Sequence, residues 1–154
     1  MAGPNMDMVT ELQMVLRRDF PLADSTLLQP LGSNPLVDGE WLELDTNYKL
    51  ARGSGSGDKA LVFPVFTERG RYDTQAIGKV SVLFAGPYEA ETSICDLTSL
   101  VIGDALMVAD VTIGAVTKRG LKKATSGAFV VGYVTKLPGS GKVRFLHAGL
   151  GTAA

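Results

Sequence analysis

The chain has 154 residues, which is enough for one domain with its own hydrophobic core. Its 15 Lys and Arg residues against 16 Asp and Glu give a net charge of −1, which argues against a nucleic-acid-binding protein that works by bulk positive charge. A single cysteine, Cys95, excludes an internal disulfide, and a single histidine, His147, excludes a usual zinc site built by one chain.

The sequence gives no sign of a membrane or secretory segment. No apolar run approaches the ~18 residues of a transmembrane helix. The N-terminus lacks the basic-then-apolar pattern of a signal peptide. We therefore expect a protein that is made in a cytoplasm and has no membrane partner.

Residues 6–20 carry the one apolar spacing that fits a helix. Met8, Leu12, Val15 and Leu16 fall near one helical face, and Pro21 would end the segment. A helix of this length is marginal by itself, so we expect it to pack on another surface.

Residues 22–39 have no clear period, and prolines and glycines interrupt them repeatedly, which predicts an extended arm. The arm carries more apolar residues than a solvated tail does, so we expect it to contact a partner. These candidate contact residues are Leu27, Leu28, Leu31, Leu36 and Val37. The predicted organisation is an N-terminal helix and arm over residues 1–40 and a β-barrel domain over residues 41–154.

The remainder of the chain alternates apolar and polar residues between glycine-rich turns, which predicts a mainly β fold. Pro64 lacks a backbone N–H, so its strand should lie at an edge or a bulge. The pattern favours a compact antiparallel β-barrel or β-sandwich. Strands are expected at residues 41–48, 60–67, 79–84, 88–94, 105–111, 115–117, 128–136 and 142–147, with hairpins joining the third to the fourth and the seventh to the eighth.

No group of residues forms a recognisable catalytic site. Cys95, Asp96 and His147 could serve as nucleophile, orienting acid and base, but no local signature surrounds them. Residues 138–142 match a phosphate-binding loop poorly, because a strand follows them where that motif needs a helix. We therefore predict that the chain is not an enzyme and needs no cofactor or metal. The carboxylates of residues 38–45 leave a cation site as an alternative to a solvated strand edge.

Two further groups of side chains suit contacts with another macromolecule. Arg69, Arg71 and Tyr72 are of types enriched at protein interfaces. Lys118 and Arg119, with Lys122 and Lys123, form a basic cluster that we expect in a loop around Gly120, where it would contact a protein or a phosphate backbone.

The C-terminal half resembles the decoration, or cement, proteins of tailed-bacteriophage capsids. The resemblance rests on residues 100–104 (Leu-Val-Ile-Gly-Asp), Gly114, residues 128–134 and residues 141–145. Residues 63–65, with Arg69, Gly70 and Asp73, extend it to roughly two thirds of the chain.

The resemblance implies a β-tulip-like domain on the outer surface of an icosahedral phage head. Such proteins often form homotrimers and hold neighbouring copies of the major capsid protein together after the shell expands. They belong to the virion and are structural proteins without enzymatic activity. The residues alone leave open an alternative function, that of a small OB-like or SH3-like β-barrel that binds nucleic acid or peptide through the basic cluster.

Overall fold

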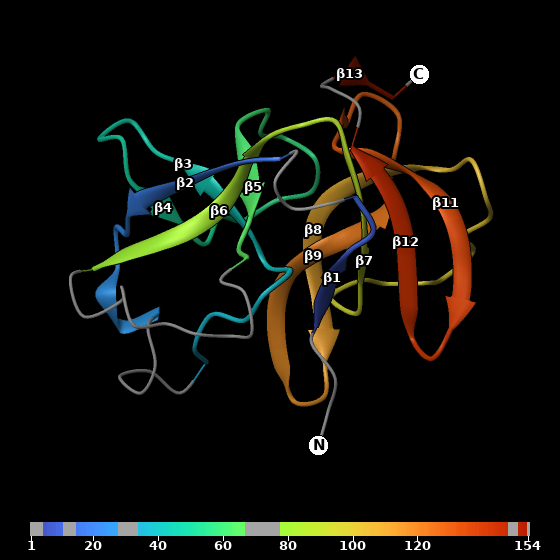
Figure 1. Cartoon of the computed structure of the whole chain (residues 1–154), viewed down its shortest axis with the longest axis horizontal. Coiled ribbons are helices and arrows are strands. Elements are labelled where there is room, and N and C mark those ends of the chain that lie inside the picture. Colours follow the sequence, from blue (N-terminus) through green and yellow to red (C-terminus); the bar gives the residue numbers. More distant parts are fainter. Residues whose placement is uncertain (1–4, 11–14, 28–33, 67–77, 148–150, 154) are drawn as a thin grey trace.

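The structure is a computed structural model, and it describes residues 5–10, 15–27, 34–66, 78–147 and 151–153 (Figure 1). The described chain is mainly β, as the sequence predicted, and falls into two lobes. In chain order its elements are β1 (Met6–Met8), β2 (Leu16–Pro21), the short 3-10 helix η2 (Ser25–Leu27), β3 (Trp41–Leu44), β4 (Leu50–Ala51), β5 (Val62–Pro64), β6 (Lys79–Ala85), β7 (Tyr88–Thr92), β8 (Ala105–Ile113), β9 (Val116–Lys123), β10 (Phe129–Val130), β11 (Gly132–Gly139), β12 (Lys142–His147) and β13 (Gly151–Thr152).

The larger lobe is a curled antiparallel sheet of six strands, in the order β1-β7-β12-β11-β8-β9. The hairpin of β11 and β12 is confirmed, and its turn residues Ser140 and Gly141 have φ values of 62° and 72°. β8 and β9 form a second, longer hairpin in which Ile113 pairs with Val116. A two-stranded pairing of β10 with β13 lies against this lobe.

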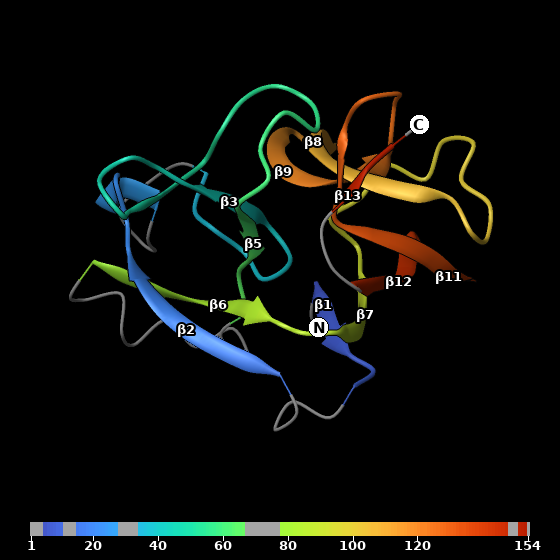
Figure 2. The same ribbon diagram turned by 90° about the horizontal axis from the view of Figure 1, so that it is seen from above.

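The smaller lobe holds two short sheets, β4-β3-β5 and β2-β6 (Figure 2). β5 lies at the edge of its sheet, where Pro64 pairs with Trp41. This confirms the expected edge position, since proline cannot donate to a second neighbouring strand.

β3 separates two hydrophobic cores. Successive side chains of a strand point to opposite faces. Trp41 therefore enters the core of the larger lobe, with Phe145 and Leu106, whereas Leu42 enters the core of the smaller lobe, with Phe20. β3 therefore contributes to both cores, as does β6, where Val82 enters the smaller core and Leu83 the larger one.

The predicted helix over residues 6–20 is wrong. Its described ends are strands: β1 pairs with β7, and β2 pairs with β6. On β2 the side chains of residues 16–19 are exposed and Phe20 is fully buried. Burial of Phe20 and pairing with an existing strand outweigh the marginal stability of a short helix.

The hairpin predicted between residues 79–84 and 88–94 is also wrong, although both strands exist. β6 pairs with β2, while β7 pairs with β1 and β12. Residues 85–87 thus carry the chain from one lobe to the other. Val82 of β6 packs in the core of the smaller lobe and Ala90 of β7 in that of the larger one, while Leu83 of β6 also enters the larger core.

The described part of the arm packs on its own chain. Leu27 and Leu36 are buried in the core of the smaller lobe, and the Leu36 N–H donates to the Leu27 carbonyl at 2.8 Å. Val37 is half-buried. Leu28 and Leu31 lie outside the described residues. Within the described ranges, no helix has the length and apolarity needed to cross a membrane.

Candidate functional site

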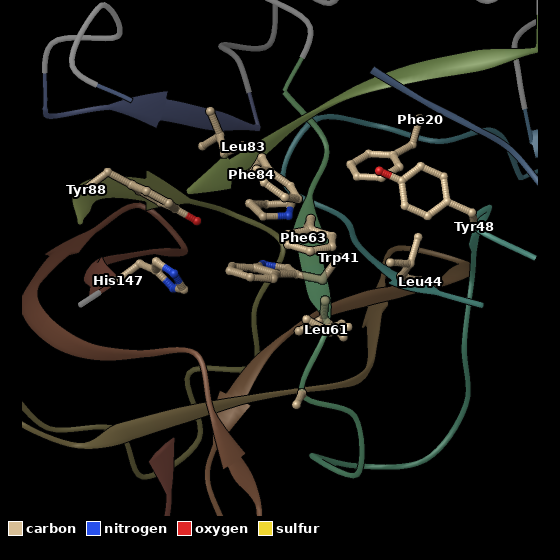
Figure 3. Close-up of a pocket in the computed structure, with 13 residues that line it drawn as sticks. Phe20, Trp41, Leu44, Tyr48, Leu61, Phe63, Leu83, Phe84, Tyr88 and His147 are labelled. Carbon is tan, nitrogen blue, oxygen red and sulfur yellow. The ribbon is translucent and has the colours of Figure 1, made fainter. Parts of the chain in front are cut away.

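An aromatic cavity of about 300 Å³ lies where the two lobes meet (Figure 3). The residues that line it come from β2, β3, β5, β6, β7, β12 and the loops beside them. They are Phe20, Trp41, Leu44, Tyr48, Ala60, Leu61, Val62, Phe63, Pro64, Leu83, Phe84, Tyr88 and His147. We refer to this site as the aromatic cavity.

One end of the aromatic cavity is open and apolar. Tyr48 and Leu61 there are 50% and 53% exposed. Phe63 stacks on Phe20 at a centroid distance of 5.9 Å and lies 5.3 Å from Phe84. The Arg18 guanidinium lies 5.0 Å from the Phe20 ring, a distance typical of a cation–π contact. These contacts hold the rings at the opening in fixed positions.

The other end carries buried polar groups. Trp41 and Tyr88 are 1% and 2% exposed, and neither the Trp41 Nε1 nor the Tyr88 hydroxyl has a hydrogen-bond partner. The His147 ring lies beside them, 5.0 Å from the Tyr88 ring and 6.5 Å from the Trp41 ring. Figure 3 shows the hydroxyl end of Tyr88 directed from β7 toward Trp41, with His147 next to the space between them.

The protonation of this end follows from its contacts. His147 Nδ1 lies 2.6 Å from the Val131 carbonyl oxygen, which can only accept, so Nδ1 carries the proton. A neutral His147 then presents Nε2 as an acceptor. Burial raises the pKa of Tyr88 far above its usual value, so its hydroxyl stays protonated.

The predicted basic loop is wrong, because residues 118–123 belong to β9 and not to a turn. Lys118 donates to the Pro35 carbonyl at 2.5 Å, and its burial lowers its pKa. Arg119 donates to Asp110 at 2.9 Å and to the Gly55 carbonyl. Lys118 and Arg119 are 5% and 3% exposed.

The other two cations of the cluster, Lys122 and Lys123, also have acidic partners, Asp96 at 3.7 Å and Asp104 at 3.0 Å. All four basic side chains therefore have partners within the chain. The structure does not present them together as an open basic patch.

The carboxylates of residues 38–45 do not form a solvated edge. Glu40 is fully buried beside the Arg52 guanidinium, and Asp38 is 6% exposed. Asp45 accepts hydrogen bonds from the backbone N–H groups of Asn47 and Lys49 within its own turn. Among the described residues, no three His, Cys, Asp or Glu side chains are grouped as metal ligands would be.

Cys95 and His147 occupy different places. His147 lines the aromatic cavity, whereas Cys95 pairs through its backbone with Leu121 of β9, and its Sγ faces the carbonyls of Thr92 and Gly141 at 3.7 Å. Burial, together with the charge of Asp96, raises the pKa of Cys95 to about 11. The thiol is therefore protonated at neutral pH and is a weak nucleophile.

A second surface feature is a group of exposed apolar side chains. Tyr133 and Leu146 pair directly across β11 and β12, so their side chains share the outer face of the sheet. Val101 and Ile102 precede Gly103, whose N–H donates to the Val134 carbonyl at 2.8 Å. We call Val101, Ile102, Tyr133 and Leu146 the apolar face.

A spacing of two from Phe129 and Val131 would place Tyr133 on the buried side of a regular strand. The alternation of buried and exposed side chains is interrupted at Gly132, which is buried. A Cβ at this position would lie 2.9 Å from the Leu146 carbonyl oxygen. Val131 and Val134 are buried as a result, and Tyr133 is 45% exposed. The predicted contact residues Arg69, Arg71 and Tyr72 lie outside the described residues.

Comparisons of this chain with protein-family models, with curated protein sequences and with solved structures found no match.

Proposed function

We propose that this chain is a structural virion protein that binds the outer surface of a tailed-phage head and stabilises the expanded lattice of the major capsid protein. The observation that carries the proposal is the position of the segments that resemble decoration proteins. Residues 100–104 are far in the sequence from the hairpin of β11 and β12 yet adjacent to it in the fold, and together they carry the apolar face.

The exposure of the apolar face supports a protein partner. Ile102 is 68% exposed, Val101 58%, Tyr133 45% and Leu146 37%. Exposed apolar patches and exposed aromatic rings are typical of protein interaction sites. The long backbone-paired sheet beneath gives this face a rigid support.

A homotrimer would present three copies of the apolar face to a shell of threefold or quasi-threefold symmetry. A low affinity of each single contact would then still give a high overall affinity, because the second and third contacts form within a complex that already exists. This function needs no cofactor and no reactive side chain. The alternative of a nucleic-acid-binding module receives no support from the basic cluster, whose four cations are paired within the chain.

The proposal predicts saturable binding to expanded heads and weak binding to unexpanded heads, measured by co-sedimentation with heads that lack this protein. Replacing Ile102 with aspartate should weaken the binding at least about tenfold, since it places a charge in the apolar contact. Ser54→Asp adds the same charge in the exposed residues 54–56 and should leave the binding unchanged. Equal binding to both forms of the head, or wild-type binding by Ile102→Asp, would contradict the proposal.

A further inference from the structure

We propose that the aromatic cavity is a binding site for a small, flat phenolic molecule, that is, an aromatic ring bearing a hydroxyl group. This site goes beyond the proposed attachment to a phage head. It shares no residue with the apolar face, so each can be tested without the other.

The size and lining of the cavity fit such a ligand. Its volume of about 300 Å³ lies at the lower end of the range for small-molecule sites and suits one or two fused rings. The walls are mostly aromatic and aliphatic, which favours stacking of a planar apolar body. Tyr48 and Leu61, each about half exposed, mark the side from which a ligand would enter.

The buried polar groups define the ligand's functional group. The Trp41 Nε1–H can only donate, a neutral His147 offers an acceptor at Nε2, and the Tyr88 hydroxyl can do both. A hydroxyl group is the small substituent that accepts from Trp41 or Tyr88 and also donates to His147. A hydrocarbon would leave these groups without partners.

The unpaired state of Trp41 and Tyr88 supports a ligand role. Buried polar groups are nearly always hydrogen-bonded, and an unpaired one destabilises the fold. Two residues that line one cavity carry such groups, beside His147, whose Nδ1 lies 2.6 Å from the Val131 carbonyl oxygen. Because both atoms are closed to water, the ligand must move the surrounding side chains slightly to reach them.

The sole tryptophan of the chain makes the test direct. The indole N–H of Trp41 gives a single resonance in a ¹H–¹⁵N spectrum, and titration of the full chain with 2-naphthol should shift it. We expect a dissociation constant of roughly tens of micromolar for 2-naphthol. Naphthalene, which lacks the hydroxyl, should bind about tenfold more weakly, because it leaves the polar groups unpaired.

Two variants make the assignment specific. Tyr88→Phe removes one hydrogen-bonding group and should weaken 2-naphthol binding about fivefold, while naphthalene binding stays the same. The same variant should unfold at a higher urea concentration than the wild type, since it removes a buried unpaired hydroxyl. Tyr133→Phe, on the outer face of the sheet, is the control and should alter neither ligand's binding.

Four results would overturn the proposal. They are the absence of 2-naphthol binding, equal affinity for 2-naphthol and naphthalene, an unshifted Trp41 resonance at saturation, and equal effects of Tyr88→Phe and Tyr133→Phe. None of these results bears on attachment to a phage head.

Discussion

Replacing Arg52 with methionine is expected to lower the free energy of unfolding by about 3–5 kcal/mol. Glu40 is fully buried, and its Oε2 accepts a hydrogen bond of 2.9 Å from Arg52. Arg52 also donates to the Asn34 carbonyl, and this hydrogen bond holds the segment before β3 next to Arg52. Without the guanidinium, the buried carboxylate loses its charged partner while remaining shielded from water. Urea unfolding followed by circular dichroism measures the loss.

A double variant distinguishes the effect of losing the ion pair between Glu40 and Arg52 from the effect of losing packing contacts. Glu40→Leu combined with Arg52→Met removes both charges and should recover most of the stability, because an apolar pair avoids the cost of desolvating ions. A loss below about 1 kcal/mol for Arg52→Met alone would mean that the pair is effectively solvated, as exposed ion pairs are. That result would contradict the buried position of Glu40.

Replacing Gly120 with alanine is expected to cost about 3 kcal/mol of stability. A Cβ at this position would lie 2.4 Å from the Ile94 carbonyl oxygen and 2.7 Å from Val111 Cγ2. The Ile94 carbonyl also accepts a hydrogen bond from the Leu121 N–H at 3.0 Å, so it cannot move away from Gly120 without breaking that bond. β9 and the segment beside it that contains Ile94 must therefore move apart. Urea unfolding is again the measurement.

Gly114 provides a matched control on the hairpin of β8 and β9. A Cβ there would meet nothing within 4 Å, and its φ of 62° is the only obstacle to another residue. Gly114→Ala should therefore cost only about 1 kcal/mol. If Gly120→Ala lowers the free energy of unfolding no more than Gly114→Ala does, the close approach of Gly120 to the Ile94 carbonyl is wrong.

Strands with strong local signals could be predicted from the sequence. β12 matches its predicted range, residues 142–147, because its alternation of buried and exposed side chains begins directly after a glycine turn. Pro64 marked an edge strand correctly, because a missing N–H is a local property. These features depend on neighbouring residues and on nothing distant.

The errors arise where distant partners decide the structure. The spacing of Met8 and Leu16 also fits a helix, and nothing in the sequence shows that β1 and β2 pair with β7 and β6. Gly120 was expected in a turn, yet it lies within β9, where its lack of a side chain allows the approach of Ile94. A glycine that permits close contact and one that permits a turn look alike in the sequence.

The aromatic cavity could not be predicted for the same reason. Trp41, Tyr88 and His147 lie on β3, β7 and β12 and meet only through the curvature of the sheet and the packing of the two lobes. The apolar face was missed because the break at Gly132 reverses the alternation. Three of its four residues, Val101, Ile102 and Tyr133, lie in the segments on which the resemblance to decoration proteins rests.

Quantitative mass spectrometry of purified virus particles from the source of this gene tests the proposed attachment to a phage head most directly. Attachment to the shell predicts this protein in the particles at a copy number close to that of the major capsid protein. Its absence from the particles, or its presence only at trace level, would contradict a stabilising role on the head.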